Sequence, residues 1–287
     1  MQKHNFLIRS LTGVLFVAVM VGGILYSPFT CALLFLLITI LTVWEFTGIV
    51  NTQADTDVNR FITTVAAAAF YLGFWGYTTT HFSSMAFLPW VLSMVYLLIA
   101  ELYLQRPRPL LNWATSMMAQ LYIALPFGLL NLILRASDME LYTILHDDGY
   151  VCVLAIFVFL WCSDTGAYCC GSLFGKHKLF PRVSPGKTWE GSIGGGVFTV
   201  AVSQIIACYL PVLTPWQWAG FALVVVIFGT WGDLVESLLK RQLGIKDSGH
   251  ILPGHGGMLD RFDSSLMAIP ASFAYLCILG YCAIAAL

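Results

Sequence analysis

Residues 216–239, WQWAGFALVVVIFGTWGDLVESLL, decide the fold together with the polar run that follows at 240–264. The first run is long and apolar enough for an α-helix to cross a bilayer, which takes about 20 residues. The second run, KRQLGIKDSGHILPGHGGMLDRFDS, holds four cations, three carboxylates, two histidines and five glycines, and it cannot lie in hydrocarbon. The pair predicts a membrane-spanning helix that leads into a polar loop.

Apolar runs separated by short polar segments recur along the whole chain. Of its 287 residues, 59% are hydrophobic and 10% are charged, against about 25% charged in soluble domains. We expect an all-α, polytopic integral membrane protein, because helices satisfy their own backbone hydrogen bonds in lipid. The nine expected transmembrane helices lie near residues 11–27, 29–50, 60–79, 85–104, 112–134, 150–171, 191–210, 216–239 and 265–286.

The distribution of basic residues predicts the orientation. With the N-terminus in the cytoplasm, all of the 14 Lys and Arg residues except Arg135 fall in cytoplasmic segments, as the positive-inside rule requires. Nine spans then leave the C-terminus outside. We interpret the first apolar run as an uncleaved span rather than a signal peptide, because no A-x-A-like site follows it. We expect residues 1–110 to form N-terminal membrane helices, and 111–287 a catalytic membrane region with cytoplasmic loops 172–190 and 240–264.

Composition also excludes some partners. The net charge of −1 argues against a nucleic-acid partner, which would require a basic surface. The eight cysteines form no C-x-x-C pair and fall mostly in apolar runs. They are therefore typical of small core residues rather than of a disulfide or zinc framework.

Two acids lie inside expected spans. Asp164 and Asp233 are each about 10 Å below the expected cytoplasmic surface, at 1.5 Å per helical residue. A buried carboxylate needs a strong partner, so the acids indicate either one shared polar cavity open to the cytoplasm or two separate buried pairs. The helix face that carries Asp233 continues through Glu236, Ser237 and Lys240 into the 240–264 loop.

Other polar or small residues have simpler interpretations. Glu45 and Glu101 lie near cytoplasmic span ends, where we interpret them as interfacial or helix-packing carboxylates. The alanines at 66–69 with Gly73, and the glycines at 191 and 194–196, indicate close helix packing.

Residues 172–190, SLFGKHKLFPRVSPGKTWE, form the second chemical stretch. Ser184, Lys187 and Thr188, followed by Glu190, are typical of a phosphate or nucleotide loop. The stretch is not a Walker A motif, because Pro181 replaces its first glycine. A basic surface loop that binds anionic lipid headgroups is the alternative.

The long polar run resembles the signature of the phosphatidate cytidylyltransferases (CDP-diacylglycerol synthases) of bacterial type. Thirteen positions fit that pattern at its spacing, and the 184–191 stretch is similar to a second run in the same enzymes. The matching residues are Ser237, Lys240, Arg241, Lys246, Asp247, Gly249, Pro253, His255, Gly256, Gly257, Asp260, Arg261 and Asp263.

The resemblance implies transfer of the cytidylyl group of CTP to phosphatidate, giving CDP-diacylglycerol and pyrophosphate. It implies a multi-pass enzyme of the cell inner membrane, facing the cytoplasm among membrane lipids, and a homodimer. Carboxylates beside cations also suit Mg²⁺, alone or with a second cation. The expected catalytic residues are Asp233, Asp260, Lys240, Arg241, Lys246, His255 and Arg261. The expected substrate-binding residues are Ser184, Lys187, Thr188, Glu190, Ser237, Gly256 and Gly257. The expected metal ligands are Asp233 and Asp260, supported by Asp164, Asp247 and Asp263.

Two other classes of function remain open from the sequence. A transporter would also place acids in membrane helices, but it predicts paired inverted repeats, and the charged helices here gather in the second half. A CTP-dependent lipid kinase would use the γ-phosphate and release CDP. A CDP-alcohol phosphotransferase is disfavoured because the Asp-Gly-x-x-Ala-Arg motif is absent.

The predicted orientation can be tested by cysteine labelling in intact cells. A Lys178→Cys variant, on a background without the native cysteines, should resist an impermeant thiol reagent and react after the membrane is opened. Efficient labelling from outside would reverse the orientation.

Overall fold

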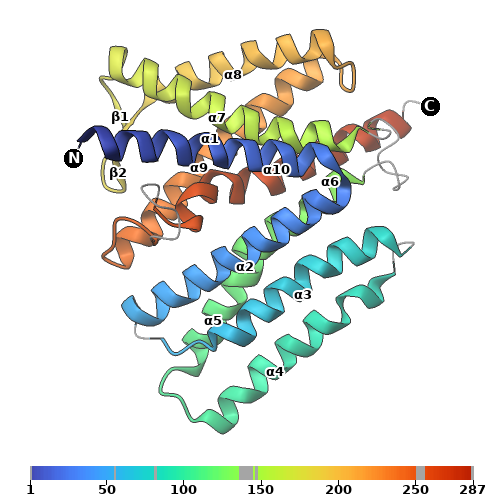
Figure 1. Ribbon diagram of the computed structural model, residues 1–287, viewed down its shortest axis with the longest axis vertical. Coiled ribbons are helices and arrows are strands. Elements are labelled where there is room, and N and C mark those ends of the chain that lie inside the picture. The colour runs from blue at the N-terminus through green and yellow to red at the C-terminus, as the bar shows by residue number, and fades with distance from the viewer. Residues whose placement is uncertain are drawn as a thin grey trace. The chain divides into compact units, whose positions relative to one another are not determined.

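The computed structural model describes residues 2–54, 56–80, 83–135, 145, 148–249 and 256–285, with side chains described between residues 12 and 283 of these ranges. Its elements are α1 (Gln2–Tyr26), α2 (Pro28–Gln53), α3 (Arg60–Thr79), η1 (Ser84–Phe87), α4 (Leu88–Leu104), α5 (Pro109–Met118), η2 (Ala119–Ala124), α6 (Leu125–Leu134), α7 (Gly149–Phe174), β1 (Lys178–Phe180), β2 (Ser184–Thr188), α8 (Trp189–Tyr209), α9 (Pro215–Gln242) and α10 (Met258–Ala285). Figure 1 shows them along the chain.

Membrane-spanning helices dominate the described part of the chain. Eight helices are long and apolar enough to cross a bilayer, and a shorter apolar helix covers Thr12–Tyr26. The expected all-α polytopic class is therefore confirmed. The span Pro109–Leu134 is built from α5, the π-helical turn η2 and α6 in succession.

One local expectation was wrong. Residues 172–190 are not all loop, because β1 and β2 form a small antiparallel hairpin in which Lys178 pairs with Thr188. The polar residues at 163–166 lie inside a continuous helix, since α7 runs from Gly149 to Phe174. Thr165 Oγ1 donates to the carbonyl of Trp161 at 2.8 Å, so its hydroxyl is satisfied within the helix.

The chain forms two compact units. The first comprises Met1–Leu132 with Gln242–Phe262, and the second comprises Ile133–Arg241 with Asp263–Leu287. The sequence predicts a division at residue 110 between N-terminal membrane helices and a catalytic region. That division is one of function, and it stays a prediction.

In the first unit, small residues let helices pack closely. Ala66 and Ala67 of α3 are fully buried, which confirms the packing predicted for this run. On the same helix Phe70 stacks on Trp90 of α4, with ring centroids 4.3 Å apart. Glu101 accepts hydrogen bonds from Arg106 at 2.9 Å and Asn112 at 3.1 Å, so its interpretation as a packing carboxylate is also confirmed.

In the second unit, α7 and α8 lie side by side, joined by the hairpin (Figure 1). Their backbones touch through glycine. A Cβ at Gly195 would lie 2.6 Å from the carbonyl oxygen of Ser163, and one at Gly166 would lie 2.9 Å from the Cα of Gly195. The helices can approach this closely only because neither position carries a side chain, and the predicted packing role of the 194–196 glycines is confirmed at Gly195.

Gly195→Ala should lower the melting temperature of the detergent-solubilised protein. The added methyl collides with backbone, and overpacking costs about 1–3 kcal/mol, more than the roughly 1 kcal/mol gained in helix propensity. Gly22→Ala is the matched control, because a Cβ there meets nothing within 4 Å. An unchanged melting temperature for Gly195→Ala would show that the two helices can separate at little cost.

Candidate active site

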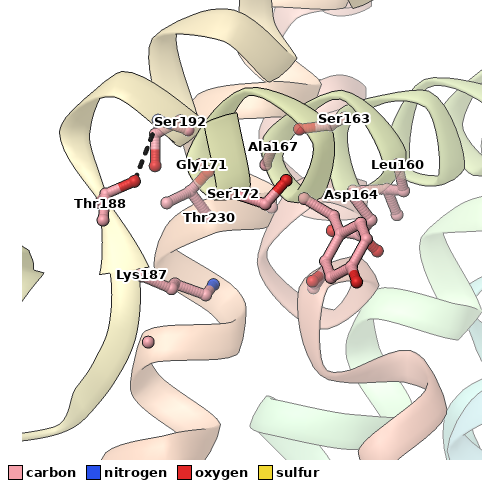
Figure 2. A pocket seen from close by; sticks show the side chains of 15 residues that line it. Leu160, Ser163, Asp164, Ala167, Gly171, Ser172, Lys187, Thr188, Ser192 and Thr230 are labelled. Carbon is pink, nitrogen blue, oxygen red and sulfur yellow. Dashed lines mark hydrogen bonds between the residues drawn. The ribbon is translucent and has the colours of Figure 1, made fainter. Parts of the chain in front are cut away.

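The second unit contains a polar cavity of about 360 Å³. Figure 2 shows that α7 contributes Asp164 and Ser172 to its wall, while Lys187 reaches it from the hairpin. Ser163, Thr188, Ser192 and Thr230 add hydroxyl groups from three helices and the strand β2. A cavity lined by an acid, a lysine and hydroxyls suits a polar ligand rather than a lipid tail.

An ion pair joins the two predicted chemical stretches. Lys187 Nζ lies 2.5 Å from a carboxylate oxygen of Asp233, and both side chains are 27% exposed. Ser237 Oγ donates to the other Asp233 oxygen at 3.2 Å. Three residues predicted for the site therefore meet, although Lys187 and Asp233 lie in separate motifs.

Asp263 joins this group from α10. It interacts electrostatically with Asp233, Asp164 and Lys187. The close approach depends on Gly232, where a Cβ would lie 2.6 Å from the carbonyl oxygen of Asp263. We call Asp164, Asp233, Asp263 and Lys187 the acidic cluster. When all four are ionised, its three carboxylates and one ammonium give it a net charge of −2.

The acidic cluster fits a hard cation in its donor chemistry. Among the described residues, no three His, Cys, Asp or Glu side chains form a ready-made metal site. Mg²⁺ is commonly held by only one or two carboxylates, together with waters and substrate phosphates. The residues therefore suit Mg²⁺ bound with a phosphate ligand, and the metal roles of Asp164, Asp233 and Asp263 stay predictions.

In the first unit, Glu45 organises the end of the signature stretch. Its buried carboxylate accepts N–H groups from Met258 at 3.0 Å and Leu259 at 3.1 Å, and the hydroxyl of Ser248 at 2.5 Å. Met258 and Leu259 open α10, and these N–H groups have no partner inside the helix. Glu45 therefore caps α10, and its interpretation as a simple packing carboxylate was incomplete.

Ser248 and Asp260 complete the cap. Ser248 Oγ accepts the N–H of Asp260 at 3.3 Å. Asp260 Oδ2 accepts the N–H groups of Gly257 at 3.0 Å and Ser248 at 2.9 Å. This gives Asp260 a structural role that the sequence did not reveal, and its metal role stays a prediction.

The glycines of the signature have a steric reason in the cap. A Cβ at Gly257 would collide with Glu45 and Ser248, and one at Gly249 would lie 2.7 Å from Glu45 Oε2. Gly256 has a φ of 84°, which favours glycine. The substrate-binding roles predicted for Gly256 and Gly257 stay predictions beside this packing role.

Two basic residues at the end of α9 have protein partners. Lys240 pairs with the fully buried Glu236 at 2.6 Å. Arg241 Nε donates to the carbonyl of Val183 in the hairpin turn at 3.4 Å. The Arg241 bond joins the end of α9 to the hairpin, whereas the Lys240–Glu236 pair lies within α9, and the catalytic roles predicted for both residues stay predictions.

The remaining cations and acids of the signature face outward. Lys246, Asp247 and Arg261 are exposed. The predicted residue His255 lies outside the described residues, as do His250 and Pro253 of the same stretch. The exposed cations can reach a soluble ligand, and their predicted roles are untested.

The hairpin residues divide between structure and cavity. Thr188 caps α8 by accepting the N–H of Gly191 at 3.2 Å, and it also lines the cavity. Glu190 accepts the N–H groups of Lys176 and His177 at 3.2 Å and pairs with the His177 ring at 2.5 Å, which closes the base of the hairpin. Ser184 stands in β2 opposite Phe180, and it does not line the cavity.

Glu45→Gln should loosen the first turn of α10. The amide keeps the shape of the side chain but loses the negative charge, which two backbone N–H groups and the helix dipole stabilise. The substitution should therefore cost about 1.5–3 kcal/mol of stability at this cap. Hydrogen exchange at Met258 and Leu259 should accelerate. Glu101→Gln is the control, because it removes a buried carboxylate of the same unit that does not touch α10. Equal exchange in the two variants would contradict the capping role.

The comparisons with known proteins agree with the signature. The model of the cytidylyltransferase family matches residues 7–279. The phosphatidate cytidylyltransferase of Haemophilus influenzae is 33% identical over 284 residues, which cover 90% of this chain and 93% of that protein. The proteins of the same name from Staphylococcus haemolyticus and Staphylococcus aureus are 48% and 46% identical over 126 residues, which cover 44% of this chain and 48% of each protein. The matched stretch thus spans about half of each staphylococcal relative and nearly all of the Haemophilus one. With the signature complete and the family match extending over almost the whole sequence, this chain belongs to the cytidylyltransferase family.

Proposed function

We propose that this membrane protein is a phosphatidate cytidylyltransferase, which joins CTP and phosphatidate to give CDP-diacylglycerol and pyrophosphate. Family membership supports the reaction class. The structural observation that supports the proposal is the Lys187–Asp233 ion pair beside a polar cavity. Both substrates are anionic, so the reaction needs positive charge, which Lys187 would supply directly and the carboxylates would supply through a divalent ion.

The chemistry requires little acid–base help from the protein. An oxygen of the phosphatidate phosphate attacks the α-phosphorus of CTP, a new P–O bond forms, and the bond to the bridging oxygen of the β-phosphate breaks. A phosphate monoester has a second pKa of about 6, so at pH 7 the nucleophile is already largely dianionic. The site must therefore align two anions and neutralise the leaving pyrophosphate.

The residues of the chain divide this work. Lys187, anchored by Asp233, holds a phosphate in the cavity, while the exposed Lys246 and Arg261 attract the triphosphate from water. The hydroxyls of Thr188 and Ser192 offer further hydrogen bonds to phosphate oxygens. Asp233, with Asp164 or Asp263, would hold Mg²⁺, which when bound supplies charge neutralisation at the phosphates.

The setting follows from the same proposal. The active site faces the cytoplasm at the inner membrane, and the distribution of Lys and Arg, which favours cytoplasmic polar loops, supports this orientation. Phosphatidate enters with its tails in the bilayer, and the enzyme works as a homodimer.

Labelled CTP tests the reaction. Purified protein with phosphatidate and Mg²⁺ should convert α-labelled CTP into chloroform-soluble lipid and release γ-label as pyrophosphate. Removal of divalent ions by a chelator should stop both. Entry of the γ-label into lipid would instead identify a lipid kinase.

Asp233→Asn tests the site. It keeps the side-chain shape but removes the charge that holds Lys187 and would hold the cation, so turnover should fall by at least about 100-fold. Asp57→Asn is the control, since that acid is 67% exposed and belongs to the first unit. Wild-type turnover of Asp233→Asn would remove Asp233 from the site without changing the enzyme class.

A further inference from the structure

A second hollow of about 640 Å³ lies between α8, α9 and the hairpin. The α8 wall repeats at helical spacing through Trp189, Ile193 and Val200, and Leu223 and Trp231 belong to the facing wall of α9. Among the described residues that line it, only Ser192 and Thr230 carry hydroxyl groups, and none is charged. We call this hollow the apolar groove.

The apolar groove is continuous with the polar cavity. Ser192 and Thr230 line both hollows, so one pair of hydroxyls stands where the two meet. On one side of this pair are Lys187 and Asp164, and on the other are only apolar and aromatic side chains and a glycine. The polarity therefore changes from ionic to hydrocarbon-like across the junction, as it does along a phospholipid.

The length of the apolar groove suits a single lipid tail. From Trp189 to Val200 the wall rises about 16 Å, at 1.5 Å per helical residue. One leaflet of a bilayer has a hydrocarbon depth of about 15 Å, half of the 30 Å core. The half-exposed Trp189 lies at the end of the groove nearest the hairpin, as expected for an aromatic residue at a membrane interface.

We infer that the apolar groove holds one acyl chain of phosphatidate while its phosphate passes the Ser192–Thr230 junction into the polar cavity. This inference rests on the proposed function. Because the bilayer is as apolar as the groove, moving a tail from one to the other adds little binding free energy, and the contact serves to orient the lipid. Seating one tail fixes the direction from which the phosphate reaches Lys187, which is how remote contacts align a nucleophile.

Photo-cross-linking tests the inference on the unaltered chain. Phosphatidate with a diazirine near the methyl end of one acyl chain is activated on the protein in lipid nanodiscs. Label should gather on α8 and α9 peptides around Val200 and Leu223. Excess unlabelled phosphatidate should remove it, and excess phosphatidylcholine should not. Label spread over the lipid-facing helices, label that both lipids displace equally, or a cross-link between two copies at this face would overturn the inference.

A substitution at the far end of the groove tests the same point by kinetics. Val200→Phe should reduce kcat/KM for dipalmitoyl phosphatidate about tenfold, and leave kcat/KM for dioctanoyl phosphatidate and KM for CTP unchanged. Ile205→Phe is the control, because Ile205 is 60% exposed on the same helix and lines neither hollow. Equal effects on long and short chains would contradict the groove. Normal turnover of dioctanoyl phosphatidate would at the same time uphold the proposed reaction, so the two ideas fail separately.

Discussion

The buried carboxylate of Glu45 is the constraint on which the signature stretch depends. A charge in a membrane helix is costly unless it is fully hydrogen-bonded, and here it is bonded to two backbone amides and a hydroxyl. The start of α10 supplies those amides together with the positive end of a helix dipole. Each side thus satisfies the other, and α10 begins at a defined residue. The fixed first residue sets the phase of the first turn of α10, where Asp260 accepts the N–H groups of Gly257 and Ser248.

This constraint changes how the glycines of the signature are understood. From the sequence, Gly256 and Gly257 were expected to bind substrate. In the structure Gly249 and Gly257 lie against Glu45, where any side chain would displace the carboxylate. One motif therefore combines exposed cations, Lys246 and Arg261, for which we propose a soluble anion, with glycines that let the loop close on a buried acid.

Much of the architecture could be predicted because apolar runs of spanning length have few alternatives, and the helices follow those runs closely. The hairpin could not be predicted, because a strand as short as Lys178–Phe180 has too few residues to show the alternation of polar and apolar side chains that marks a strand. Glu45 was misjudged because its partners lie 203 to 214 residues away in sequence. The chemistry of Lys187 and Asp233 was expected from their motifs, but their pairing was not, because local spacing carries no information on which separate segments meet.

The Lys187–Asp233 pair also has a thermodynamic consequence. With no phosphate present, the ammonium of Lys187 neutralises the carboxylate that a divalent ion would need. A phosphate that draws Lys187 toward itself exposes that carboxylate to a cation, and a cation on Asp233 releases Lys187 toward phosphate. If both ligands bind here as proposed, their binding is linked, and each raises the affinity for the other by the same factor. Such reciprocity would favour nucleotide and metal arriving together over a resting enzyme that holds either one alone.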